Sequence, residues 1–223
     1  MKKRFKMVFL FIVAFAISIS VTNLCINSKP KEIVIEGMIP QLTEQELILN
    51  SDLIVTGTVS ATGESKWSNP DFKVEEKRNI LQTDIFVEID EILYGEYNKE
   101  NVVVRIDKGY DKAQKIRYIS DGYPDFEKDE KVLLFLSRDD SDVATDEDYF
   151  VLTGMRQGKW NINNEEILKK NTDGKEISSL DELKTEQLKE RIITDIKEHP
   201  TWKADKLREK EEIKNNNKLL FGE

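Results

Sequence analysis

The segment SDLIVTGTVSA (Ser51–Ala61) decides the fold, because it has the clearest β-strand pattern in the chain. Polar and apolar residues alternate along it, and one face carries Leu53, Val55, Val59 and Ala61. This period of two is expected of a strand with one face against a core. Gly57 interrupts the apolar face, and a glycine inside a strand marks a bulge or a sharp bend. The segment therefore predicts a core strand that bends near its middle.

Four later segments predict further strands: Leu81–Leu93, Val102–Asp107, Glu130–Ser137 and Tyr149–Thr153. The first two alternate in the same way, whereas Glu130–Ser137 is apolar on both faces and should be the most buried strand. In Leu81–Leu93 the alternation breaks at Glu91 and Ile92, where a bulge would restore it. A hairpin with its turn at Asn163-Asn164 is expected over Lys159–Leu168. Five strands with a long insert after the first predict a mainly β, α+β fold, built as a small five-stranded OB-like barrel that is partly open.

In the sequence, helices are expected before the first strand and after the last strand of this barrel. Thr43 to Glu46 fits a capping box and predicts a short helix over Glu44–Asn50. Ser179 to Glu182 fits a second box, and a helical repeat of apolar residues then runs to Pro200: Leu180, Leu183, Leu188, Ile192 and Ile196. The second helix should dock on the barrel, and the charged segment 201–223 should form a solvated helix with a frayed tail.

The N-terminus has the pattern of an export signal. Four cations in Met1–Lys6 precede the uncharged apolar run Met7–Val21. The basic end should stay in the cytosol, so residues after about Asn27 should lie outside the membrane. Residues 1–26 are thus either a cleaved signal peptide or a retained membrane anchor, and both alternatives stay open. The expected organisation is leader 1–26, tether 27–41, barrel 42–170, docking helix 171–200 and charged tail 201–223.

Composition limits the classes of function. The chain has 223 residues and a net charge of -9, which disfavours nucleic acid as a partner. Cys25 is the sole cysteine, so an intramolecular disulfide is excluded, although lipid attachment to Cys25 is an alternative. The sole histidine, His199, precedes Pro200 at a predicted helix end, where it is a poor candidate for a catalytic base. GxSxG, HExxH and P-loop motifs are absent from the sequence.

Four strand segments carry a resemblance to a known family: SDLIVTGTV at Ser51, FVEIDEILYG at Phe86, VVVRID at Val102 and EKVLLFL at Glu130. Together they resemble bacterial exported proteins whose domain is similar to the tissue inhibitors of metalloproteinases and the netrin-like domains. The resemblance covers about residues 42–168 and implies an OB-type barrel. In the animal inhibitors a mature N-terminal cysteine, pinned by disulfides, binds the target zinc. Cys25 has no partner cysteine, so the resemblance does not carry this mechanism.

Two loops supply candidate functional residues. The long connection Lys108–Lys128 holds four aromatic residues that are expected to form a binding face: Tyr110, Tyr118, Tyr123 and Phe126. The acidic loop that follows the fourth strand could offer carboxylates to calcium, although it lacks EF-hand spacing: Asp140, Asp142, Asp146 and Asp148. No other cofactor is indicated.

The sequence therefore predicts an extracytoplasmic, non-enzymatic module that binds a protein, a peptide or an envelope component. If its leader is not cleaved, it also contacts the membrane through that segment. Two alternatives remain: an inhibitor or regulator of an extracellular enzyme, and a metal-assisted hydrolase that uses the acidic loop.

Overall fold

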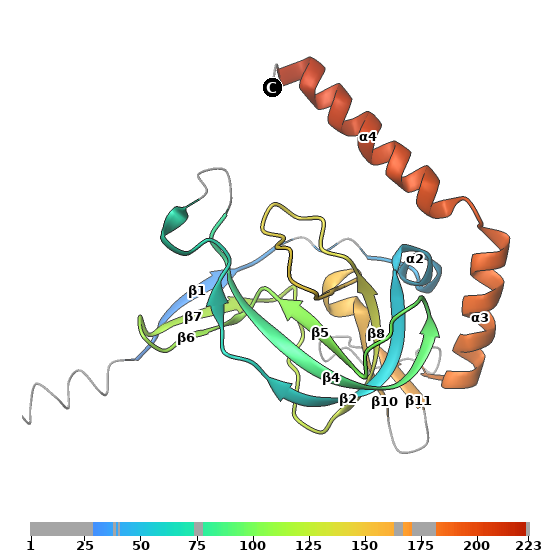
Figure 1. The fold of residues 1–223 in the computed structure, drawn as a ribbon, viewed down its shortest axis with the longest axis horizontal. Helices are drawn as coiled ribbons and strands as arrows, with labels where there is room; N and C mark the ends of the chain where they lie inside the picture. The colour runs from blue at the N-terminus through green and yellow to red at the C-terminus, as the bar shows by residue number, and fades with distance from the viewer. Residues whose placement is uncertain are drawn as a thin grey trace, which may run out of the picture.

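The computed structural model describes residues 29–37, 39, 41–73, 78–162, 167–170 and 182–221. These residues form a strand-rich α+β fold with two open sheets and three α-helices (Figure 1). The predicted leader 1–26, the turn at Asn163-Asn164 and the start of the second capping box at Ser179 lie outside the described residues. Within the described residues, no helix is both long enough and apolar enough to cross a membrane.

The large sheet is built around the strand that the sequence singled out, β2 (Leu53–Thr62). Antiparallel partners flank β2 on both sides, β4 (Leu81–Tyr94) and β8 (Lys131–Ser137). The remaining strands of this sheet are β3 (Lys66–Trp67), β5 (Asn101–Ile106), β9 (Val151–Leu152), β10 (Lys159–Ile162), β11 (Ile167–Lys170) and β12 (Glu182–Lys184). The predicted strands and the predicted pairing of the hairpin are thus present, with ends shifted by one or two residues.

Gly57 lies at the bend of β2, as the sequence predicts. A Cβ atom there would lie 2.4 Å from the carbonyl oxygen of Glu88 on β4, so only glycine allows the two backbones to come this close. The pairing of β2 with β4 shifts register at three places: between Thr56 and Gly57, which pair with Glu91 and Ile89, between Ile54 and Val55, which pair with Tyr94 and Ile92, and between Val59 and Ala61. Bulges therefore bend the two strands together close to where the sequence pattern breaks.

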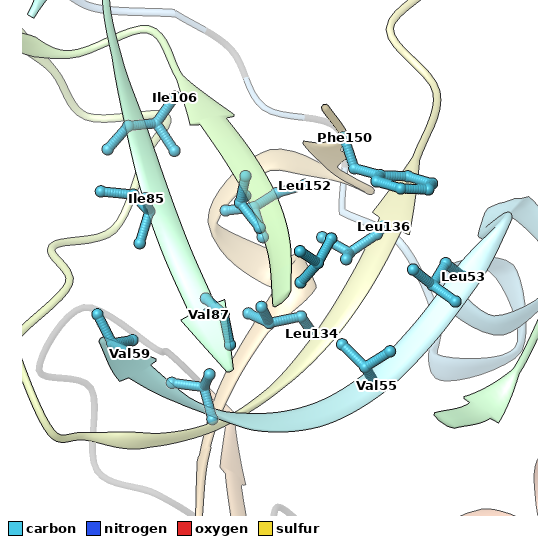
Figure 2. Packing of buried hydrophobic residues seen from close by; sticks show 13 residues of the cluster. Leu53, Val55, Val59, Ile85, Val87, Ile106, Leu134, Leu136, Phe150 and Leu152 are labelled. Carbon is cyan, nitrogen blue, oxygen red and sulfur yellow. The ribbon is translucent and has the colours of Figure 1, made fainter. Parts of the chain in front are cut away.

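The concave side of this sheet holds the main core, which draws buried residues from β2, β4, β5, β8 and the segment at Phe150 (Figure 2). Val55, Val59 and Val87 are fully buried. Each such side chain contributes about 1.5–3 kcal/mol to the stability of the fold. Alternate residues of the strands point into this core, which explains why the sequence shows a period of two.

The strand-rich α+β class is confirmed, but the large sheet does not close into a barrel within the described residues. The fifth predicted strand explains the difference, because its regular part is only the two-residue β9. Phe150, just before β9, forms one isolated parallel bridge to Val104 of β5. The Phe150 amide donates to Val103 at 2.9 Å, and the Phe150 carbonyl accepts from the Arg105 amide at 2.8 Å.

Two helices cover the outer face of β2, β8 and β10. The predicted capping box starts α2 (Glu44–Asn50), since the Glu46 amide donates to Thr43 Oγ1 and the Thr43 amide donates to Glu46 Oε2. A second apolar cluster lies on this outer face and draws residues from α2, β2, β8 and β10. Leu188 and Ile192 of α3 (Thr185–Glu198) are buried in this cluster and so dock the helix on the sheet. The docking prediction is confirmed. The predicted helix start is wrong, because Glu182–Lys184 pair with β11 as strand β12 instead of forming a first helical turn.

The smaller sheet lies on the opposite side of the molecule from α3 (Figure 1). It consists of β1 (Lys31–Ile35), β7 (Ile116–Ser120) and β6 (Gly109–Asp111). Strand β1 comes from the predicted tether and pairs in parallel with β7, which comes from the predicted long loop. The two segments that looked irregular in the sequence thus order each other.

The last helix, α4 (Trp202–Phe221), projects from the domain (Figure 1). Its first turn is fixed to the domain, because Trp202 Nε1 donates to Asn50 Oδ1 at 2.9 Å and Lys203 Nζ donates to the Ser51 carbonyl at 2.6 Å. Charged residues dominate the helix, in agreement with the predicted solvated segment.

Candidate functional site

A cleft of about 490 Å³ opens where the small sheet meets the ends of β4 and β5. Its walls come from segments far apart in the sequence: the end of β2 and the turn after it, β4, β5, the β6–β7 hairpin, and the loop at Asp125–Phe126. Core residues Ile85 and Ile106 form part of its lining, and Figure 2 shows them together at one end of the core cluster. The cleft is therefore an opening above the end of the main core.

Three of the four predicted aromatic residues line this cleft: Tyr110, Tyr118 and Phe126. Tyr110 is 38% exposed, and the guanidinium carbon of Arg117 lies 5.8 Å from its ring centre. Tyr118 meets Trp67 edge to face, and partial burial raises the pKa of its hydroxyl. Aromatic surface that is left open beside a cation suits recognition of another molecule.

Tyr123, the fourth predicted residue, is not part of the cleft lining. Its ring packs against the main core, and its hydroxyl donates to Asp107 Oδ2 at 3.2 Å. Burial, followed by the nearby Asp107 carboxylate, raises the pKa of the Tyr123 hydroxyl. Gln82 Nε2 donates to the other oxygen of Asp107 at 2.8 Å. Tyr123 thus provides a hydrogen bond to a half-buried carboxylate and packs on the core that lies beneath the cleft.

A set of hydroxyl contacts fixes the β6 wall of the cleft. Ser65 Oγ and Thr83 Oγ1 are 2.8 Å apart, and Thr83 also donates to the Lys108 carbonyl at 2.6 Å. The Tyr110 amide donates to Ser65 Oγ at 2.9 Å. A Cβ atom at Gly109 would lie 2.4 Å from Ser65 Oγ, so the close approach of β6 requires glycine. The position of Tyr110 is therefore set by contacts of its backbone.

The opposite wall is held by Lys159, whose side chain is buried. Its ammonium pairs with Glu130 at 2.8 Å, donates to the Asp125 carbonyl at 2.8 Å and lies 4.8 Å from the Phe126 ring centre. A buried lysine is tolerated only when its charge has such partners. These contacts fix the loop that presents Asp125 and Phe126 to the cleft.

The charges of the cleft differ in their pairing. Lys108 Nζ pairs with Asp125 Oδ1 at 2.5 Å, and the Asp125 side chain is 87% exposed. Arg117 is exposed and forms no ion pair within the part of the chain that the structure describes. The sequence reasoning missed Arg117, Lys108 and Asp125, although all three belong to the long connection that supplied the aromatic candidates.

The outer face of β4 and β5 carries a second polar group, the ionic cluster of Lys66, Asp84, Arg105 and Glu147. Arg105 is 2% exposed and donates to both oxygens of Asp84, at 2.6 and 3.0 Å. It also bonds Glu147 and stacks 3.8 Å from the ring centre of Tyr149. Hydrogen bonds from Lys66 and then Arg105 lower the pKa of Glu147 to about 2. All four charges in the cluster are paired.

The acidic loop is also engaged in ion pairs. The Asp142 carboxylate accepts hydrogen bonds from the guanidinium and the amide of Arg78, which lower its pKa to about 2, and Asp148 pairs with Lys99 and Arg138. Asp140 lines a separate cleft beside α4, and Asp146 is exposed. Among the described residues, no three His, Cys, Asp or Glu side chains are grouped so that they could hold a metal ion.

His199 directly follows α3, and its Nδ1 lies 3.0 Å from the Asp195 carbonyl oxygen while its ring meets Trp202 edge to face. It is thus occupied at the junction between α3 and α4, away from the cleft. No protein-family model matches this chain, and no curated protein is similar to it. The functional assignment accordingly rests on the geometry of the cleft.

Proposed function

We propose that this protein is a non-enzymatic binding module that acts outside the cytoplasm and recognises a peptide segment of another protein through the cleft. The observation that carries the proposal is the convergence of Tyr110, Tyr118 and Phe126 on one opening above the core. The export pattern of residues 1–26 supports the extracytoplasmic location. The proposal is the same for a cleaved and for a retained leader.

The dimensions and lining of the cleft support a peptide as the ligand. A volume of about 490 Å³ lies within the usual range for a small-molecule pocket and accommodates one or two side chains. Hot spots at protein interfaces are enriched in aromatic residues and arginine around such pockets. Tyr110 and Arg117 provide one aromatic residue and one arginine on the β6–β7 wall, whose backbone is held by strand pairing and by the hydrogen bond from the Tyr110 amide to Ser65 Oγ.

The proposal includes the finer fold, an OB-like barrel. The strand neighbours run from β8 through β2 and β4 to β5, and the Phe150 bridge connects β5 with the segment that continues into β9 and back to β8. One core cluster with members from all five segments supports this arrangement. OB-type barrels commonly bind ligands on the outer face of their second and third strands, here β4 and β5. The ionic cluster covers that face, which favours the cleft as the binding site.

Selection from a random peptide library against the full-length chain in mild detergent tests the proposal. We expect binders whose affinity falls at least about tenfold in Tyr110→Ala, because an exposed aromatic anchor is lost. Phe72→Ala is the matched control, since Phe72 is 65% exposed and lies outside the cleft lining. Failure to select any peptide, or peptides whose binding ignores Tyr110, would refute the proposal.

A further inference from the structure

The charges around the cleft suggest which peptides would be preferred. The segment 108–117, which builds one wall, has four cations and one acidic residue in a chain with a net charge of -9. The acidic residue, Asp111, accepts a hydrogen bond from Trp67 Nε1 at 2.7 Å and two more from backbone amides. Lys108 and Lys112 pair with Asp125 and Glu64, so Arg117 is the cation of the cleft lining that has no ion pair among the described residues, and it favours an anionic group beside it.

Arg117 is the cation best placed to contact a ligand. It lines the cleft, lies beside the Tyr110 ring and makes no ion pair among the described residues. Its planar guanidinium can donate two parallel hydrogen bonds to a carboxylate. The same cleft has an apolar part that belongs to the main core, formed by Ile85, Ile106 and Phe126.

We infer that the cleft selects acidic peptides in which an Asp or Glu adjoins a large apolar residue, an inference that rests on the proposed function. The apolar side chain enters above Ile85 and Ile106, and the carboxylate pairs with Arg117. Asp125 competes for the second cation of the cleft, because it already pairs with Lys108. A ligand carboxylate would exchange places with Asp125, whose side chain is almost fully exposed.

Synthetic peptides with both ends blocked test this inference. A selected binder is compared with versions that carry Asp, Asn or Lys beside the apolar residue, and affinity is measured by calorimetry on the full-length chain. We expect Asn to bind about tenfold or more weakly than Asp, because a charge-assisted hydrogen bond is lost. Blocked ends restrict the carboxylate to a side chain. A peptide that requires a free C-terminal carboxylate instead would overturn the inference.

Three variants test which residues cause the preference for acidic peptides. Arg117→Glu should reverse it, so that the Lys peptide binds better than the Asp peptide. Asp125→Asn should tighten the Asp peptide about two- to fivefold, because it frees Lys108 from an exposed ion pair. Lys112→Ala should leave affinity within about twofold, because Lys112 lies on the same hairpin, pairs with Glu64 at 3.5 Å and is not part of the cleft lining.

The outcomes separate the two proposals. Peptides that depend on Tyr110 but bind equally with Asp, Asn and Lys would refute the acidic preference and leave the binding function standing. Equal losses in Arg117→Glu and Lys112→Ala would also refute it, because the effect would then come from general charge and not from contact in the cleft. Absence of any Tyr110-dependent peptide would refute both.

Discussion

Two arginines on neighbouring parts of this fold have opposite environments. Arg105 on β5 is buried, bonded to two carboxylates and stacked on Tyr149, whereas Arg117 on β7 is exposed, has no ion pair among the described residues and lies 5.8 Å from the ring centre of Tyr110. The first arginine joins β4 and β5 to the loop that precedes β9. The second leaves its hydrogen-bond donors available in a cleft. Arginine thus stabilises the fold at position 105, whereas at position 117 its hydrogen-bond donors remain exposed to solvent and to a ligand.

The difference has a physical cause in the backbone around each residue. Asp84 lies directly opposite Arg105 on β4, and the segment at Phe150 brings Glu147 to the same place. Arg117 is opposite Tyr110 on β6 and Glu32 on β1, and neither forms an ion pair with it. A buried guanidinium must be paired, whereas an exposed one is solvated by water.

The largest expected effect comes from removing the buried arginine. Arg105→Ala should lower the free energy of unfolding by about 3–5 kcal/mol, because it leaves Asp84 without its main partner in a half-buried position. Arg117→Ala is the matched control and should change stability by no more than about 0.5 kcal/mol. Urea unfolding followed by circular dichroism measures both. Similar losses in the two variants would contradict the contrast between the two faces.

The sequence predicted the local elements well, because their signals are local. The capping box at Thr43 and Glu46 predicts α2 with the bounds that the structure shows, alternation locates β2 within two residues, and a continuous apolar run locates β8 within one residue. The parallel pair of β1 and β7 could not be predicted, since Lys31–Ile35 is a short apolar patch whose partner lies far along the chain. Glu182–Lys184 was misread for the same reason, because pairing with β11 overrides its helical pattern.

The candidate site was predicted in part. Aromatic residues in a long connection indicated Tyr110, Tyr118 and Phe126, which the β6–β7 hairpin and the Lys159 contacts bring together. Tyr123 has the same residue type and lies in the same connection, but its hydroxyl donates to Asp107, just after β5, and its ring packs on the core outside the cleft lining. In the sequence, Arg105 and Arg117 look alike, because the partners that distinguish them arrive from distant strands.

A smaller effect should appear in the pH dependence of the ionic cluster. The folded pKa of Glu147 is about 2, below its ordinary value of 4.5, so its contribution to stability is complete above about pH 5 and is lost as the pH falls toward 2. Glu147→Gln should therefore be less stable than the wild type at pH 6, and the two should converge near pH 2. Because the Glu147 side chain is 56% exposed, the gap at pH 6 should stay below about 1 kcal/mol.

Urea unfolding at several pH values measures this gap. Glu64→Gln is the matched control, because Glu64 is 91% exposed and its ion pair with Lys112 is 3.5 Å long, so the substitution should leave the stability almost unchanged. A gap between the wild type and Glu147→Gln that stays constant down to pH 2 would show that the carboxylate does not act through its charge.

The smallest effect is expected for the ion pair between Arg78 and Asp142, which joins the loop after β3 to the acidic loop. The hydrogen bonds are short, 2.6 and 2.9 Å, but the two side chains are 65% and 39% exposed. Exposed pairs contribute about 0–1 kcal/mol even with good geometry, and salt screens them. Arg78→Ala should therefore cost less than about 1 kcal/mol at low salt and almost nothing at about 1 M NaCl, measured by urea unfolding. If Arg78→Ala destabilised the fold as much as Arg105→Ala, exposed ion pairs between loops would contribute as much to stability as the buried arginine. The proposed contrast between a buried, paired arginine and an exposed, unpaired one would then lose its physical basis.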